Sequence, residues 1–504
     1  MKIVLVQPPV EDFYFTPHRS SVLGLHALAY VWTKKGHNCQ VLNFPLEKPK
    51  KKKIPLPEKL EYLTPYLNKH NNEIKNSLWF SNYYRFGPPI KICCERIMEL
   101  EPRVVAVSCF AWSYAETTLS LLKMLRENFQ ENPPLLVVGG AGASVMPDFF
   151  TPFADLVIIG EGENAIGEIE KAVALKRNIL PGSKSTTNSP MEIPFSWDIK
   201  EKKKNRFTVT TMLSRGCPKM CSFCANHLVF GKALRIVDIK AVLMGIDNIL
   251  DYVLKKSKSP DLETDRSAEH KDKIKLHINF EDDNILFKKK YFLTVLEYIK
   301  LKCDQNKIGF SFSTENGMDY LLLNDDLLVN LKNLNLTQLN LSMASMDSDQ
   351  LKLEKRVGSI KKLEILLKKS EQLGLPVITY FICGLKNDTP VKIVETLAYL
   401  HSLKTSIGIS HYYPVPGLAD WQDQNVFLDN PPFLCCGSSA YPWNRSLSTR
   451  ELITAFRLAR ASNYIKENLY DTGLVSNLKN NLLKDVTMEE AMVNLFFTLV
   501  DPND

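Results

Sequence analysis

Short apolar runs alternate with longer mixed stretches along the first third of the chain. The stretches 23–35 and 114–128 predict helices. Runs rich in valine, leucine and isoleucine predict strands over residues 2–6, 104–108, 135–138 and 156–159, the first of them buried, and a further strand is expected at 38–43. Because strands that alternate with helices predict a doubly wound parallel sheet, we expect a Rossmann-like α/β domain over residues 1–175.

The same alternation of strands and helices resumes in the second half of the chain. The expected strands there cover residues 207–213, 276–280, 308–313, 338–342, 377–382 and 408–412. Six strand-plus-helix units predict a partial (β/α)6 barrel of the TIM type over residues 206–420. A polar cluster follows the carboxyl end of each later strand, which is the face where barrel enzymes keep their sites.

Two further segments complete the expected organisation. Residues 176–205 are polar and contain proline and serine, and they predict a linker between the two α/β domains. Residues 421–504 predict a mostly helical C-terminal extension, which we expect to cover the mouth or the side of the barrel.

Composition limits the class of protein without identifying it. Hydrophobic residues make up 45% and charged residues 24% of the 504 residues, which is typical of an ordinary globular protein. The net charge of +7 is modest. The short lysine runs of the sequence are typical of solvated loops, so a nucleic-acid partner is not expected. The sequence contains no run of eighteen apolar residues, so no membrane span is predicted. The 11 cysteines form no disulfide framework, and we expect reduced thiols and a cytoplasmic location.

Three cysteines stand close together after the strand predicted at 207–213. Cys217, Cys221 and Cys224 have the spacing Cys-x3-Cys-x2-Cys, and clustered thiolates are typical of an iron–sulfur site. Three thiolates are one too few for a four-iron cube, so one iron would stay open to nitrogen and oxygen donors. The alternative is a structural zinc site, with His227 as the fourth ligand.

This cysteine spacing, with the aromatic Phe223 just before the third cysteine, resembles the signature of the radical S-adenosylmethionine (SAM) superfamily. The resemblance implies a 4Fe–4S cluster whose open iron binds the amino and carboxylate groups of SAM. An electron from the cluster would then split SAM into methionine and a 5′-deoxyadenosyl radical. It also implies a reducing partner such as flavodoxin or ferredoxin.

The resemblance further implies which residues contact SAM. Phe223 would lie beside the adenine, and carboxylates would lie near the SAM ammonium. The full set implied for SAM is Phe223, Glu281, Asp282, Glu315, Ser342, Ser345, Ile382 and Gly384. The alternative for the acidic residues is a solvated strand end, and for the serines an ordinary position on the barrel rim. Glu315, with the neighbouring Asn316, could instead contact the substrate.

The glycine turns of the first domain resemble a cobalamin-binding domain that precedes many radical SAM cores. Val-Val-Gly-Gly follows one predicted strand and Gly-Glu-Gly-Glu follows the next. The resemblance implies cobalamin at the carboxyl edge of the sheet, near Ser108, Gly139, Gly140, Gly160 and Gly162. The Asp-x-His-x-x-Gly motif is absent, so no histidine of this domain is expected to bind cobalt. The alternative is a Rossmann-like domain that binds no cofactor.

Together these resemblances predict a cobalamin-dependent radical SAM methyltransferase that acts on an unidentified small molecule or peptide. One alternative is a related oxidoreductase or cyclase that transfers no methyl group. Another is a methylthiotransferase, which would need a second cluster on N-terminal cysteines; Cys39, Cys94 and Cys109 are present, but the loop at 7–9 has none. An iron–sulfur scaffold or regulator would leave the SAM positions unexplained.

Overall fold

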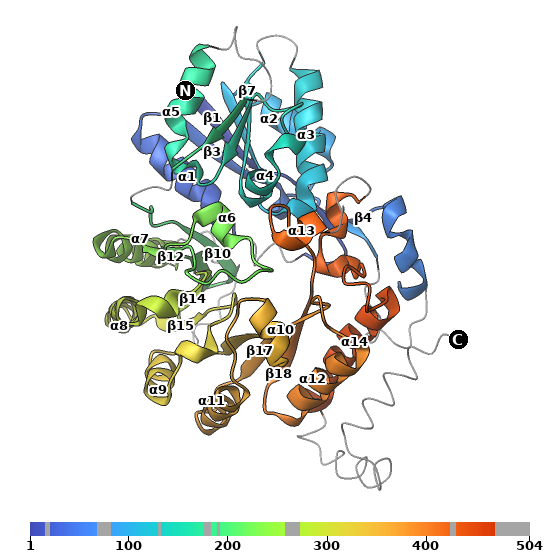
Figure 1. Cartoon of the computed structure of the whole chain (residues 1–504). Helices are drawn as coiled ribbons and strands as arrows, with labels where there is room; N and C mark the ends of the chain where they lie inside the picture. The colour runs from blue at the N-terminus through green and yellow to red at the C-terminus, as the bar shows by residue number, and fades with distance from the viewer. Residues whose placement is uncertain are drawn as a thin grey trace, which may run out of the picture.

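The structure is a computed structural model that describes residues 1–15, 21–67, 82–129, 133–175, 183–188, 192–257, 273–423 and 430–468. Two α/β regions lie one above the other in Figure 1, with the N-terminal sheet at the top and a longer series of strands below it. No helix within these ranges combines the length and the apolar character that crossing a membrane requires.

The N-terminal sheet is parallel throughout and has the order β3-β1-β6-β7-β8-β9. Its strands are β1 (Lys2–Gln7), β3 (Asn38–Asn43), β6 (Val104–Ser108), β7 (Leu135–Gly139), β8 (Leu156–Ile159) and β9 (Ser183–Thr186). The chain moves outward from β1 in both directions, to β3 on one side and to β6 on the other. The predicted parallel α/β sheet is confirmed, and its ligand edge lies where these strands end.

Both faces of this sheet are buried, because alternate side chains of each strand enter different apolar clusters. Val4 and Val105 pack with helices α2 and α3, whereas Ile3 and Val104 pack with α1 and α5. The helices are α1 (Leu23–Lys34), α2 (Ile90–Met98), α3 (Ala115–Asn128), α4 (Ala141–Val145) and α5 (Ile166–Ala174). A strand that is buried on both faces requires a continuous apolar run rather than an alternating one.

The second region contains six parallel strands that follow one another along the chain. Strand β14 pairs with β11 on one side and β15 on the other, and β17 pairs with β16 and β18 in the same way. Two isolated parallel bridges, Phe312 to Leu336 and Met318 to Leu341, connect the two groups. The strands are β11 (Arg206–Thr211), β14 (Lys275–Phe280), β15 (Gly309–Ser313), β16 (Leu339–Ala344), β17 (Val377–Cys383) and β18 (Ser406–His411).

Helices follow the strands of this region, and several begin at side chains suited to the first turn. Asn324, Ser359 and Thr389 each accept a hydrogen bond from a backbone N–H of the turn that follows, and Pro390 starts α12. The helices are α6 (Asn226–Phe230), α7 (Ile239–Ser257), α8 (Lys289–Gln305), α9 (Asp325–Asn333), α10 (Ser348–Leu353), α11 (Ile360–Gln372) and α12 (Pro390–Ser402).

The segment predicted as a linker contributes a strand to each region. Strand β9 extends the N-terminal sheet beside β8, and β10 (Trp197–Lys203) pairs antiparallel with β11. The prediction of a linker over residues 176–205 did not include these two strands. Both lie at a sheet edge, where polar and lysine side chains can face solvent, so the sequence carries no apolar run. Residues 176–182 and 189–191 of this segment lie outside the described residues.

Two small antiparallel sheets complete the strands of the described residues. One has the order β2-β5-β4 and packs against the N-terminal domain, and the other pairs β12 with β13 beside the cysteine loop. Their bounds are β2 (Val10–Asp12), β4 (Lys52–Lys53), β5 (Tyr84–Phe86), β12 (Ser214–Arg215) and β13 (Arg235–Ile236).

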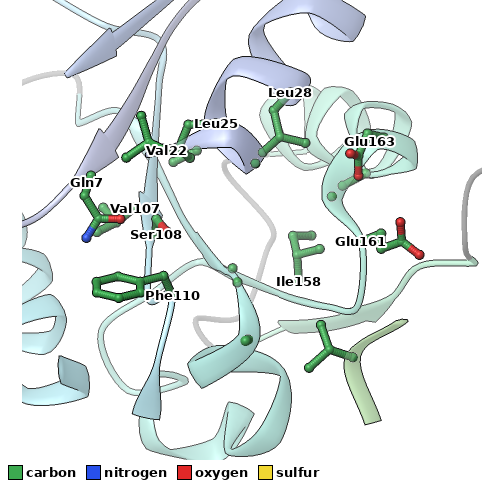
Figure 2. A pocket seen from close by; sticks show the side chains of 18 of the residues that line it. Gln7, Val22, Leu25, Leu28, Val107, Ser108, Phe110, Ile158, Glu161 and Glu163 are labelled. Carbon is green, nitrogen blue, oxygen red and sulfur yellow. The ribbon is translucent and has the colours of Figure 1, made fainter. Parts of the chain in front are cut away.

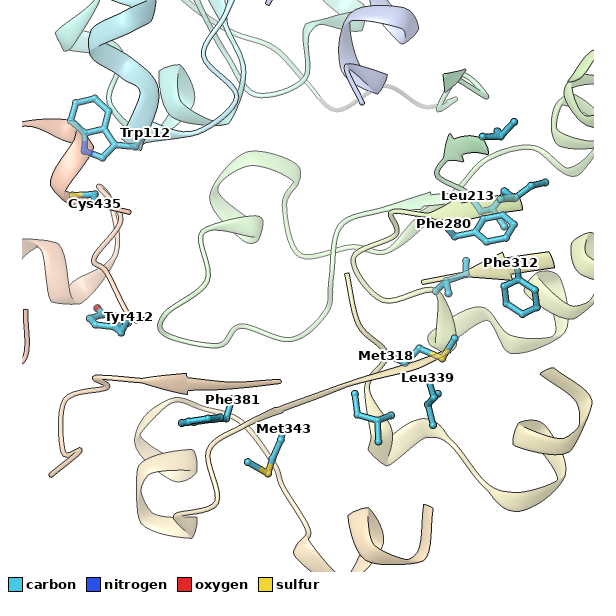
Figure 3. Packing of buried hydrophobic residues seen from close by; sticks show 14 of the residues in the cluster. Trp112, Leu213, Phe280, Phe312, Met318, Leu339, Met343, Phe381, Tyr412 and Cys435 are labelled. Carbon is cyan, nitrogen blue, oxygen red and sulfur yellow. The ribbon is translucent and has the colours of Figure 1, made fainter. Parts of the chain in front are cut away.

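One of the two apolar clusters runs through both α/β regions. Buried side chains of the N-terminal sheet and of the strands below it belong to one contiguous cluster. Trp112 and Trp421 meet edge to face between the regions, with ring centroids 6.2 Å apart. Figure 3 shows this cluster extending from Trp112 and Cys435 across to Phe381 and Phe312.

The C-terminal extension lies along the seam between the two regions. The Ser438 hydroxyl donates to Asp12 at 2.5 Å, and the Tyr62 hydroxyl donates to the Ser439 carbonyl at 2.8 Å. Its helices within the described residues are α13 (Ala419–Asp423) and α14 (Thr449–Asn468). Residues 424–429 and 469–504 lie outside the described residues.

Candidate functional site

Two aspartates at the end of β14 hold the base of the cysteine loop. The Asp282 carboxylate accepts the Leu213 N–H, at 3.0 and 3.2 Å from its two oxygens, and the Ser214 hydroxyl at 2.5 Å. Asp283 accepts the Gly216 N–H at 2.9 Å. Gly216 has a φ of +85°, so the chain turns sharply there before the first cysteine. The loop is therefore fixed by its neighbouring strand before any ligand binds.

Backbone and side-chain donors approach two of the three cysteine thiols. The backbone N–H of Lys219 and the side chain of Asn284 both hydrogen-bond to Cys217. The backbone N–H of Asn226 hydrogen-bonds to Cys224. Burial nevertheless raises the pKa of both thiols, so a bound metal must displace their protons. Hydrogen bonds of this kind tune the thiolate ligands of iron–sulfur clusters.

Arg356 connects the remaining cysteine to the strand on the far side of the loop. Its guanidinium lies 3.7 Å from the Cys221 sulfur, and it also donates to the carbonyl and hydroxyl oxygens of Ser342, at 2.7 and 3.1 Å. Nearby, buried Glu354 accepts the Ser222 hydroxyl. These contacts tie the cysteine loop to the segment that follows β16.

The three thiols fit a cluster better than they fit a single zinc ion. Within the described residues, no three or more His, Cys, Asp or Glu side chains converge closely enough to hold one metal ion. A zinc ion would draw its ligands within about 2.0–2.3 Å of one point. A 4Fe–4S cluster instead gives each thiolate its own iron and tolerates wider spacing. This wider spacing favours the cluster over the zinc site with His227.

The polar residues predicted near SAM form a connected network at the ends of β14 and β15. The Asn279 amide donates to the Glu281 carboxylate, and its oxygen accepts the Glu315 N–H at 3.0 Å. Asn316 donates to the Glu281 carbonyl at 3.0 Å. Asp282 differs, because its carboxylate faces inward to the cysteine loop and burial raises its pKa to about 7. Both of its oxygens bond to residues at the base of that loop, and its contact with the SAM ammonium stays a prediction.

The remaining SAM candidates lie at the ends of β16 and β17, except Phe223, which lies in the cysteine loop. The Ser342 oxygens accept from Arg356, and the Ser345 hydroxyl accepts the Asp347 N–H at 3.1 Å. The N–H of Gly384 is directed to Asp388 at 2.8 Å, and Gly384 has a φ of +97°. Two further candidates, Ile382 and Phe223, are half-buried and pack against the main core.

A cavity of about 290 Å³ lies at the carboxyl edge of the N-terminal sheet. Figure 2 shows Val22, Leu25 and Leu28 facing Ser108 and Ile158 across it. All five residues predicted to contact cobalamin line this cavity: Ser108, Gly139, Gly140, Gly160 and Gly162. The structure thus brings together residues from three separate strand ends.

The glycines at this edge differ in backbone conformation and in the space available for a side chain. Gly140 has a φ of +99°, and a Cβ there would lie 2.7 Å from the Cys109 carbonyl oxygen. Gly160 also has a positive φ, of +90°. At Gly139 a Cβ would meet only Ile158, at ordinary distances of 3.6 Å from its Cβ and 3.8 Å from its carbonyl oxygen. The turn itself requires two of these glycines, and Gly139 leaves open space on the cavity wall.

A buried ion-pair group joins this cavity to the cysteine loop. Arg215, which precedes Gly216, contacts Glu161 at 2.8 Å and Glu163 at 2.6 Å. Arg235 also pairs with Glu161. The side chains of Arg215, Glu161 and Glu163 are at most 6% exposed. The Gly-Glu-Gly-Glu loop of the first domain therefore holds the residue that leads into the cluster motif.

The cysteines named in the methylthiotransferase alternative do not form a site. Cys39 lies in β3, Cys94 in α2 and Cys109 after β6. Burial raises the pKa of Cys94 to about 11 and that of Cys109 to about 12. These are separate protonated thiols, not a second set of cluster ligands.

Sequence reasoning did not identify Asp283, Arg356 or the Arg215 ion pairs. Arg356 lies 135 residues from Cys221, and Asp283 lies 67 residues from Gly216. The one available signal was the acidic run after the second predicted strand, whose third member, Asp283, holds the loop.

Family models match both parts of this site. Residues 211–400 match the radical SAM superfamily, and residues 88–170 match the B12 binding domain. The chain therefore contains both domains of a cobalamin-type radical SAM protein. The matched domains imply a 4Fe–4S cluster and SAM for the second region and cobalamin for the first.

Curated relatives and a solved structure are similar to this chain. Bacteriochlorophyllide d C-12(1)-methyltransferase of Chlorobaculum tepidum is 23% identical over 297 residues, which are 56% of this chain and 58% of the relative. Hopanoid C-3 methylase of Methylococcus capsulatus is 22% identical over 352 residues, which are 65% of this chain and 62% of the relative. The chain thus spans about three fifths of the length of each relative.

The solved structure is the radical S-adenosylmethionine methyltransferase TsrM from Kitasatospora setae, with tryptophan substrate and a SAM analogue bound. It superposes with a TM-score of 0.56 at 11% identity, covering 92% of this chain and 89% of TsrM. This likeness concerns the fold.

Proposed function

We propose that this chain is a cobalamin-dependent radical SAM methyltransferase. When bound, the cluster and SAM supply a 5′-deoxyadenosyl radical and the corrin supplies a methyl group. The observation that carries the proposal is the shared wall of the first cavity. Its lining includes Gly139 and Gly160 of the N-terminal sheet together with Met212 and Arg215, which lead into the cysteine loop.

The residues of the chain would serve this reaction by holding and enclosing the cofactors. Cys217, Cys221 and Cys224 would bind the cluster, and Arg356 would place positive charge beside one thiolate. Arg215 would keep the cobalamin edge and the cluster motif in register through its buried ion pairs. The largely apolar lining of the cavity would exclude water from a reactive radical.

The finer organisation belongs to the same proposal. The arc of six parallel strands supports a partial (β/α)6 barrel over residues 206–420, and the seam contacts support a covering role for residues 421–504. Because an electron is required to cleave SAM, the proposal includes a reducing partner such as flavodoxin or ferredoxin. The 11 free thiols support a cytoplasmic location.

The experiment uses anaerobically reconstituted protein supplied with cobalamin, methyl-labelled SAM and a reductant. We expect corrin absorption bands on the purified protein, and both 5′-deoxyadenosine and S-adenosylhomocysteine as products. Protein that retains no corrin under these conditions would contradict the proposal. Bound corrin with substrate turnover and 5′-deoxyadenosine alone would favour the oxidoreductase or cyclase.

A further inference from the structure

A second cavity, of about 260 Å³, lies between the two α/β regions. Four parts of the chain surround it: the loop after β6 together with α4, the helix α6, the loop after β18, and Cys435 of the C-terminal extension. Its walls include Trp112, Val145, Phe230 and Val415. All of its lining residues belong to the described chain, and none is Asp, Glu, Lys, Arg or His. The cavity therefore offers no charged group to an occupant.

This cavity adjoins both candidate cofactor sites. Ala141, Val229 and Phe230 line it and also line the cavity at the glycine edge of the N-terminal sheet. On its other side, Ala225 and Asn226 line it directly after the third cysteine of the cluster motif. An occupant would consequently lie one layer of side chains from the cobalamin edge and beside the cysteine loop.

Two polar atoms on the cavity wall, the Asn226 amide oxygen and the Trp112 indole nitrogen, are buried without a conventional hydrogen-bond partner among the described residues. The Trp112 N–H is directed to the Cys435 thiol, so Asn226 is the group left to an occupant. Its side chain hydrogen-bonds to the Asp283 carboxylate, which must accept, so the amide nitrogen faces Asp283. The amide oxygen is buried and has no hydrogen-bond partner among the described residues. A buried acceptor without a donor is unfavourable, so the site favours an occupant with an N–H or O–H at this point.

Tyr413 shows that the open space is a recess and not a free surface. Its side chain keeps 38% of its surface accessible, yet burial raises the pKa of its hydroxyl above the ordinary value. Tyr413 lines the cavity, so its accessible surface faces a hollow that is surrounded by protein. Pro414 and Val415 continue the same wall.

We propose that this cavity binds the reacting part of the substrate, and that this part is uncharged, largely apolar and presents one hydrogen-bond donor to the Asn226 oxygen. The inference rests on the proposed function and deepens it by naming a substrate class. A phosphate or carboxylate on the reacting part would lose its hydration and find no cationic partner here.

The test measures binding of three matched probes to the holoprotein by anaerobic equilibrium dialysis. N-phenyl-1-naphthylamine is uncharged and apolar and carries one N–H. Its N-methyl derivative lacks that donor, and its 8-sulfonate carries a charge. We expect one site per chain for the neutral amine, roughly fivefold weaker binding of the N-methyl derivative, and weaker binding still of the sulfonate.

Variants locate the site. Val415→Lys and, independently, Val145→Lys place a charge on the wall and should abolish binding of the neutral amine. Met244→Lys, at an exposed residue of α7, is the matched control and should bind as the unmodified protein does. Asn226→Ala should remove the preference for the N–H probe over its N-methyl derivative while the bulk of the binding remains.

Several results would overturn the inference: no binding of any probe, equal binding of the sulfonate, or binding that both wall lysines leave unchanged. A preference for the N–H that survives Asn226→Ala would overturn the assigned acceptor. Cluster and corrin absorption bands are recorded on the same samples. Their absence would count against the proposed function, whereas intact bands without the expected probe behaviour would count against this inference alone.

Discussion

The two parallel sheets of this protein end their strands in different ways. The N-terminal sheet ends in glycines, and its carboxyl edge is a cavity lined mainly by apolar side chains. The second set of strands ends in carboxylates and amides that bond to one another, as Asn279 does with Glu281 and Asp282 with Ser214. One edge provides space, and the other provides a preformed polar scaffold.

This difference teaches how far a strand-end motif can be interpreted. A glycine that leaves space can be assigned to a bulky ligand directly, because its role is the absence of a side chain. A polar residue has to be assigned through its partners. Asp282 and Ser345 both lie at the expected edge, but each is already bonded to the protein's own backbone.

The largest expected effect concerns the polar edge. Replacing Cys217, Cys221 or Cys224 with Ala removes one of three cluster ligands, and each variant should lose its iron and the ability to cleave SAM. Iron analysis and 5′-deoxyadenosine assays measure both properties. Cys39→Ala, on an edge strand, is the matched control and should retain the cluster. A triple variant that kept iron and cleavage would refute the assignment.

The second prediction tests the ion pairs that join the two edges. Arg215→Met leaves buried Glu163 without its cation and Glu161 with Arg235 alone, and breaking a buried pair in this way costs about 3–5 kcal/mol. Denaturant unfolding should show the loss. Lys352→Met removes an exposed partner of Asp349 and should change stability little. Equal stability of both variants would contradict a linking role for Arg215.

The third prediction separates two adjacent glycines of the cobalamin edge. Gly140→Ala places a Cβ against the Cys109 carbonyl at a positive φ, and it should cost about 1–3 kcal/mol of folding stability. Gly139→Ala should fold normally but retain less corrin, because its methyl group occupies the cavity wall. Thermal unfolding and corrin absorption distinguish the two effects. Gly140→Leu would disturb the fold as well as the cavity, so it cannot test corrin binding alone.

The smallest effect concerns pH. Burial raises the pKa of Asp388 from 3.8 to about 6 in the folded protein. A carboxyl group whose pKa is higher when folded contributes stability at low pH and loses it as the pH rises through about 4 to 6. Relative to Asp388→Asn, the unmodified protein should lose on the order of 1–2 kcal/mol across that window. Denaturant unfolding at pH 4.5 and 7 measures this difference, and parallel pH profiles would contradict it.

Local sequence patterns predicted the strands and site residues that depend only on residues close to them in the sequence. The bounds of β6 and β8 followed from their apolar runs, and the three cysteines and the edge glycines followed from spacing. Arg356 could not be predicted, because nothing near residue 356 indicates that its partner is Cys221. The strand β10 was missed for a different reason, since an edge strand satisfies half its backbone with one neighbour and needs no apolar sequence.

The core shared by the two α/β regions has a consequence for how the protein unfolds. Separate domains normally melt independently, because few apolar contacts cross between them. Here the contiguous cluster includes Val105 of one region and Phe280 of the other. Unfolding either region would expose the apolar surface of its neighbour to water. The two cofactor-binding regions should therefore lose structure together, in one cooperative transition, and neither should persist as a folded fragment.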